Sequence, residues 1–172
     1  TPFGFIPYEG EQRIAYYRKA SGAGAIYAGD VVVRISDGTV TVGTAGSSQI
    51  VGVCAQFAAA STAEDIAVYD DPQQVYAVSV TTSLGMTITD YGKAFNILTS
   101  STGTGIPSTA VGRSKHAMFA LASSLVSYLK MVSLHPIEAL GPSGFVVTTS
   151  VGKPQKYLVM PNVAANNIAI TT

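Results

Sequence analysis

An Asp-Gly pair between two runs of β-branched residues is the feature that most constrains the fold of this chain. Asp37 and Gly38 lie between residues 31–35 (Val-Val-Val-Arg-Ile) and 39–42 (Thr-Val-Thr-Val). Asp-Gly suits a tight hairpin turn, and β-branched residues favour strands. The same bias runs through the whole chain, which has 19 Val and 12 Ile against 8 Leu. We therefore expect an all-β fold, either a barrel or a sandwich.

Further short apolar runs, separated by turn residues, predict more strands of the same kind. A second hairpin is expected around Asp90-Tyr91-Gly92, between residues 86–89 and 94–98. Residues 110–124 are ambiguous, because their apolar spacing fits a short helix while Ser and Gly weaken that reading. The other expected strands are at residues 50–58, 65–69, 75–80 and 126–134.

The chain divides into three regions by composition. Residues 1–25 are predicted to be an N-terminal arm, because proline and glycine interrupt its apolar residues. Residues 26–134 are expected to form a β-barrel-like domain. Residues 135–172 are expected to be a C-terminal extension with a β-hairpin around Gly152-Lys153-Pro154.

The arm is unusually aromatic for a terminal segment. A solvated tail would carry few such side chains, so we expect the arm to lie either on a neighbouring subunit or on its own domain. The candidate capsid or subunit contacts are Phe3, Phe5, Ile6, Tyr8, Tyr16 and Tyr17.

The charge of the chain is low and balanced. Only 12% of residues are charged, and 10 basic residues offset 10 acidic ones, whereas about a quarter is typical. A free monomer usually carries more charge, so we expect partner protein to cover much of the surface. We predict a homo-oligomer, specifically a trimer, built on the β region at residues 26–134. The sequence has no Lys/Arg cluster that could bind the phosphates of a nucleic acid. It also has no apolar run long enough to span a membrane. The start lacks the features of a signal peptide, so synthesis in the cytoplasm is expected.

Two Ser-x-x-Lys pairs are the nearest approach to a catalytic motif. In serine acyl-enzymes this spacing requires a helix that folds the lysine back beside the serine. Ser127 and Lys130 lie in an expected strand, where residues three apart point to opposite faces. Ser150 and Lys153 lie at a turn. No catalytic residue is therefore assigned, and we expect no enzyme activity.

Metal and cofactor sites are likewise not expected. His116 and His135 have no second ligand at metal spacing. Cys54 lies in an apolar run, which favours a buried small side chain over a reactive thiol. Asp70 and Asp71 lack the rest of a calcium loop and are interpreted as turn residues. No metal or cofactor-binding residue is assigned.

Several short motifs together resemble the head decoration, or cement, proteins of tailed bacteriophages. The resemblance covers residues 2–134. It implies a barrel or tulip-like β domain on the outside of the capsid, bound to the major capsid protein and often trimeric. The rival interpretations are a tail-tube or neck subunit and, in another class, a glycan-binding attachment module. The motifs are residues 1–7 (Thr-Pro-Phe-Gly-Phe-Ile-Pro), Arg18 with Ala20, residues 25–32 (Ala-Ile-Tyr-Ala-Gly-Asp-Val-Val), 50–53 (Ile-Val-Gly-Val), 66–72 (Ile-Ala-Val-Tyr-Asp-Asp-Pro) and 112–115 (Gly-Arg-Ser-Lys).

Overall fold

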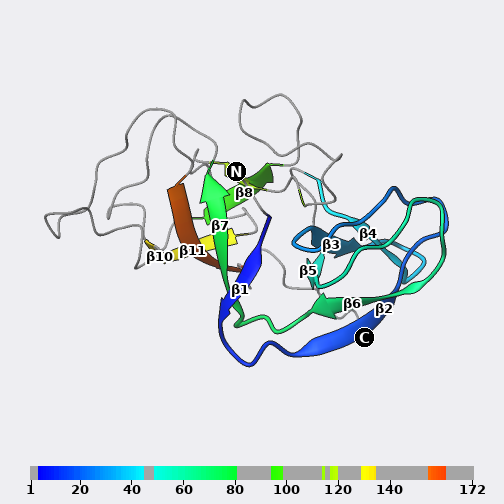
Figure 1. The fold of residues 1–172 in the computed structure, drawn as a ribbon, viewed down its shortest axis with the longest axis horizontal. Coiled ribbons are helices and arrows are strands. Elements are labelled where there is room, and N and C mark those ends of the chain that lie inside the picture. Colours follow the sequence, from blue (N-terminus) through cyan, green and yellow to red (C-terminus); the bar gives the residue numbers. More distant parts are fainter. Residues whose placement is uncertain are drawn as a thin grey trace, which may run out of the picture.

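A computed structural model describes residues 4–44, 49–80, 94–98, 114, 117–119, 129–134 and 155–161. Every regular element in these residues is a β-strand, and none of them belongs to a helix. The strands form two largely antiparallel sheets, which Figure 1 shows in two halves of the molecule. The all-β expectation is confirmed, and the arrangement is consistent with a sandwich.

The first sheet has five strands and contains the expected hairpin. Ile35 donates its N–H to the carbonyl of Thr39 at 2.9 Å, and Gly38 turns the chain with φ 85°. A core of buried side chains lies against this sheet: Ile26, Val32, Val40, Cys54, Ala58, Ile66 and Val68. The strand order is β2 (Ile14–Arg18), β6 (Asp65–Tyr69), β5 (Ile50–Cys54), β3 (Val31–Arg34) and β4 (Val40–Val42).

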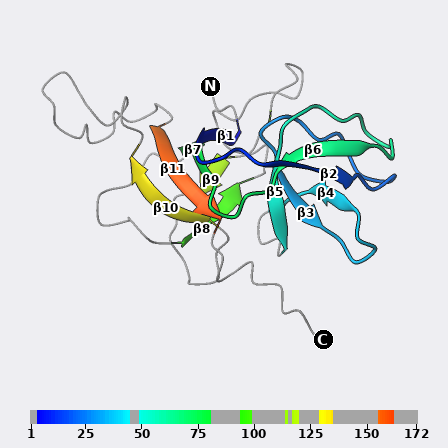
Figure 2. The ribbon, with the colours of Figure 1, turned by 90° about the horizontal axis from the view of Figure 1, so that it is seen from below.

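The second sheet has six strands and collects segments from both ends of the chain (Figure 2). β7 also pairs in parallel with β9, through Val80 and Met118 alone. This single pair does not establish a closed barrel. The strand order is β1 (Ile6–Glu9), β7 (Val75–Val80), β11 (Gln155–Pro161), β10 (Leu129–Leu134), β8 (Ala94–Leu98) and β9 (Ala117–Phe119).

Segments of the predicted arm and of the predicted extension form paired strands. β1 pairs with β7 and β2 pairs with β6, so residues 6–9 and 14–18 belong to the two sheets. β11 lies between β7 and β10, inside the six-stranded sheet. The physical reason is that strand pairing satisfies the backbone groups of these segments, which an isolated arm would leave to water. Pro7 lies in the edge strand β1, and Gly4 and Gly10, on either side of this strand, have positive φ.

The remaining expectations fall partly on described residues. Strands are confirmed at residues 50–54, 65–69, 75–80, 94–98 and 129–134, and residues 117–119, in the ambiguous stretch, form a strand. Residues 86–92 and the hairpin turn at residues 152–154 lie outside the described residues.

Two neighbouring connections join the sheets. The β1–β2 connection carries the chain from the six-stranded sheet to the five-stranded one, and the β6–β7 connection returns it (Figure 1). Arg13 Nε lies 2.8 Å from Asp70 Oδ1, and the Asp70 N–H donates to the Arg13 carbonyl. The buried Gln74 side chain accepts from Gln12 N at 3.0 Å and donates to Glu9 O at 2.7 Å. These contacts hold the two connections together.

Candidate interaction surface

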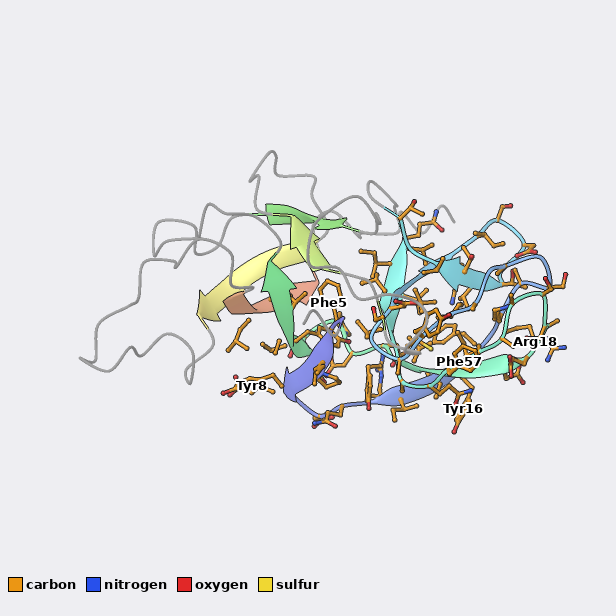
Figure 3. All side chains as sticks on the ribbon, turned by 45° about the horizontal axis from the view of Figure 1, so that its top comes forward. Phe5, Tyr8, Tyr16, Arg18 and Phe57 are labelled. Atoms are coloured by element: carbon orange, nitrogen blue, oxygen red, sulfur yellow. The ribbon has the colours of Figure 1, made fainter. Side chains whose placement is uncertain are left out.

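Among the described residues, four of the five exposed large apolar side chains lie on two edge strands. Ile6 and Tyr8 on β1 are 46% and 40% exposed, and Ile14 and Tyr16 on β2 are 47% and 72% exposed. β1 and β2 each lie at the end of a sheet order. Figure 3 shows Tyr8 and Tyr16 on the same side of the ribbon, both pointing away from it. We call these four residues the edge strip.

Strand alternation explains why the edge strip points outward. Along β2, exposed residues alternate with half-buried ones. Ile14 and Tyr16 face solvent, whereas Tyr17 packs against the core of the five-stranded sheet. Burial, and then the hydrogen bond from its hydroxyl to Asp70 Oδ2 at 2.8 Å, raise the pKa of Tyr17. The Arg34 guanidinium lies 5.8 Å from the centre of the Tyr17 ring.

Phe5 is not a surface contact, contrary to its assignment from the sequence. Its side chain is 1% exposed and meets Tyr76 edge-on, with ring centres 6.3 Å apart. Its N–H donates to the Gly29 carbonyl at 2.9 Å. Phe5 immediately precedes β1, and its contacts with Tyr76 and Gly29 place it in the core. Figure 3 shows it inside the ribbon.

The other assigned contacts divide between surface and interior. Ile6, Tyr8 and Tyr16 are exposed, Tyr17 points inward and Phe3 lies outside the described residues. The sequence assignment missed Ile14, although its spacing of two from Tyr16 predicts the same face of a strand. It also missed Phe57, which is 56% exposed and has its ring centre 5.3 Å from that of Tyr27. Phe57 follows the end of β5, so no strand alternation signals its exposure.

Three of the motifs quoted for the phage resemblance meet in space at Asp30. Ser114 Oγ donates to Asp30 Oδ1 at 2.5 Å, and the Tyr27 N–H donates to Asp30 Oδ2 at 2.8 Å. Gly4 packs so closely that a Cβ at its position would lie 2.4 Å from Ser114 Cβ. Residues from the three motifs therefore pack together, and their contacts hold the N-terminal segment, the turn before β3 and Ser114 in place.

A hollow of about 530 Å³ lies at one end of the five-stranded sheet, where its lining includes Arg18, Lys19 and Asp37. Lys19 is fully buried, and its ammonium donates to the carbonyls of Ala23 and Thr62 at 3.2 and 3.1 Å. The Asp37 carboxylate accepts two hydrogen bonds from Thr39, which lower its pKa. The charged groups are thus tied into the fold.

The described residues bring no metal-binding arrangement together. They contain no group of three or more His, Cys, Asp or Glu side chains placed to hold a metal ion. Burial raises the pKa of the Cys54 thiol, which keeps it protonated at neutral pH. Lys130 lies in β10, and the remaining members of the two Ser-x-x-Lys pairs lie outside the described residues, as do His116 and His135.

Comparison with known proteins adds no family to this picture. No protein-family model, curated protein or solved structure matches the chain. Among the described residues, no helix is long and apolar enough to cross a membrane.

Proposed function

We propose that this chain is a non-enzymatic structural protein of a tailed-phage particle, which binds the outer surface of the capsid and stabilises the shell. The observation that carries the proposal is the edge strip, where apolar side chains stand exposed on strands anchored in two sheets. An isolated exposed apolar residue is ordinary, but a set gathered along one side indicates a protein contact. The major capsid protein and further copies of the chain are the partners that this role requires.

The charge balance supports the same role. A formal net charge of zero and a charged fraction of 12% leave little electrostatic repulsion between neighbouring copies. Fully burying one large apolar side chain contributes roughly 1.5–3 kcal/mol, and covering the partly exposed residues of the edge strip gives a share of this each, which favours docking. Strands that belong to the sheets lose little conformational entropy on docking, in contrast to a flexible arm.

The test is binding of the purified chain to emptied capsids of its own phage, measured by co-sedimentation and electron microscopy. We expect saturable binding at icosahedral surface sites. Ile6→Ser and Tyr8→Ser should each weaken binding, and the pair should weaken it by about tenfold or more. Tyr8→Phe is the matched control, because it keeps the ring and should retain binding.

Two outcomes would replace the proposal. A ring of density on the tail or neck, with a bare capsid surface, would make the chain a tail-tube or neck subunit. Binding to a glycan array that is lost in Tyr16→Ala and Phe57→Ala would make it an attachment module, since exposed aromatic rings also stack on sugars.

A further inference from the structure

The backbone of β2 has one side that faces no other described strand along its first half. The Asp70 N–H donates to the Arg13 carbonyl, and the Lys19 N–H donates to the Glu64 carbonyl. In an antiparallel pair, hydrogen-bonded residues alternate. With the observed register, Ala15 and Tyr17 therefore direct their backbone groups toward β6. Ile14, Tyr16 and Arg18 direct theirs away from it.

β4 reaches this open edge only at its far end. Lys19 forms a parallel bridge with Val40, and the Ala20 N–H donates to the Val40 carbonyl at 3.0 Å. Among the described residues no strand pairs with the outward side of residues 14–17. The open segment thus combines unpaired backbone groups at Ile14 and Tyr16 with the exposed side chains of the same residues.

β1, the other edge strand of the strip, is protected in a way that β2 is not. Pro7 has no N–H, and the β1–β7 register shifts between Pro7 and Glu9. Proline and irregular pairing are devices that prevent edge strands from pairing with other chains. β2 has neither device between Ile14 and Tyr17, so it is the edge that is suited to accept another strand.

We propose that β2 pairs antiparallel with β2 of a second copy, about a two-fold axis at Ala15. This register sets Ile14 opposite Tyr16 of the second copy, and the symmetry repeats the pair. Both residues direct their backbone groups outward, so each pair exchanges both of its N–H···O=C bonds. Each pair also brings an aliphatic side chain against an aromatic ring, a favourable cross-strand combination.

The neighbouring register, with the two-fold axis at Tyr16, fits the residues around β2 less well than the register with the axis at Ala15. It would set Ile14 opposite Arg18, an apolar side chain against a cation. It would also bring the partner strand to Arg18, next to the point where β4 already bridges the edge at Lys19. The axis at Ala15 keeps the main contact within residues 14–16.

Charge favours a second copy as the occupant of this edge. The two cations that flank the open segment are neutralised within their own chain: Arg13 lies 2.8 Å from Asp70, and Arg18 lies 3.3 Å from Asp65. Two copies with zero formal net charge can therefore approach along β2 with little repulsion. This inference does not rest on capsid binding, because it concerns the free protein.

The experiment is a charge-pair rescue read by mass in solution, using sedimentation or light scattering on the full chain. The unmodified protein should form a dimer at concentrations of up to about 1 mM, where even a weak contact is populated. Ile14→Lys alone and Tyr16→Glu alone should each weaken the dimer about tenfold or more. The double variant should restore it at low salt, because each new ammonium faces a new carboxylate, and high salt should remove the rescue.

A pair of introduced cysteines tests the same strand register in a second, independent experiment. The Ile14→Cys, Tyr16→Cys double variant should cross-link into a covalent dimer on mild oxidation, since directly opposed residues lie within disulfide reach. Each single variant should cross-link poorly, because diagonal neighbours are about 7–8 Å apart. Circular dichroism checks that every variant keeps its β structure.

The inference would be overturned by a wild-type monomer throughout the concentration range, by a dimer indifferent to both single charge variants, or by a dimer that the double variant fails to restore. A trimer that ignores β2 substitutions would likewise exclude this contact. Capsid binding is measured separately through Ile6 and Tyr8, so its failure is distinguishable from the failure of β2 pairing.

Discussion

Ser114 donates a hydrogen bond to Asp30 at 2.5 Å inside the protein, although the two residues are 84 positions apart in the chain. Asp30 is 3% exposed and Ser114 is fully buried. The N–H of Tyr27 binds the other Asp30 oxygen at 2.8 Å. A buried carboxylate is stable only where donors replace its water, so Asp30 ties the turn before β3 to a distant part of the sequence.

Ser114→Ala should destabilise the protein by about 1.5–3 kcal/mol, because it removes a buried hydrogen bond to a charged group. The free energy of unfolding from urea titration measures the effect. Thr39→Ala is the matched control: it removes a hydroxyl that donates to Asp37 at 2.6 Å on the exposed surface. The control should cost less than about 1 kcal/mol. If both variants lost the same free energy of unfolding, the idea that burial strengthens the hydrogen bond to Asp30 would be contradicted.

Gly4→Ala should be more damaging than a surface glycine substitution. Gly4 has φ +77°, and an added Cβ would lie 2.4 Å from Ser114 Cβ and 2.7 Å from the Gly29 carbonyl oxygen. The left-handed backbone costs about 1–2 kcal/mol for a residue with a side chain, and overpacking adds about 1–3 kcal/mol. Gly24→Ala is the control, since nothing lies within 4 Å of its Cβ. Thermal and urea unfolding should separate the two variants clearly.

The local part of the fold was predictable, because its signals are local. Asp37 and Gly38 mark the β3–β4 hairpin within a few residues of both strands. β1 has no such signal, since its partner β7 lies about 70 positions further along the chain and Ile6 faces Ala77. A proline-containing edge strand and a free arm have the same composition, so the sequence could not distinguish them. β11 was not predicted as a central strand either, because no local signal marks its pairing with β7, which lies far earlier in the chain.

The candidate surface was predictable in kind but not residue by residue. Phe5 and Ile6 are adjacent, yet one is 1% and the other 46% exposed. Composition marks both as apolar, and only the pairing of β1 decides which side of the sheet each one faces. In β2 the alternation does separate Tyr16 from Tyr17, once the segment is known to be a strand.

Lys19 should tolerate an apolar substitute better than truncation. Its fully buried ammonium donates to the Ala23 and Thr62 carbonyls. Lys19→Ala leaves a cavity and removes both hydrogen bonds, so we expect a loss of about 2–5 kcal/mol. Lys19→Met fills most of the volume without burying a charge, and should cost clearly less. Arg18→Ala, on the neighbouring exposed side chain, should change stability by less than about 1 kcal/mol. Equal losses for the Ala and Met variants would contradict the packing argument.

Stability should fall in alkali because of two tyrosines. Burial raises the pKa of Tyr76 above its ordinary value, and the nearby Asp71 and Asp70 carboxylates raise it further. Burial and Asp70 raise the pKa of Tyr17 in the same direction. A raised pKa in the folded state means that the neutral phenol is favoured there. The resulting stabilisation is fully present below pH about 10, the pKa of an unfolded tyrosine, and is lost as pH rises through the folded pKa.

The free energy of unfolding, measured in urea from about pH 8 to pH 11, should therefore decline steeply above pH about 10. Tyr76→Phe should flatten the decline, because it removes the buried titrating group, and Tyr17→Phe should flatten it less, since its phenol is only partly buried. Tyr76→Phe should also cost about 1 kcal/mol at neutral pH through loss of the hydrogen bond from its hydroxyl to the Tyr69 carbonyl at 3.1 Å. Ile14→Val is the control, because it changes no titrating group and should leave the slope unaltered. An alkaline slope that is the same in Tyr76→Phe and the unmodified protein would show that Tyr76 is not the residue whose ionisation unfolds the chain.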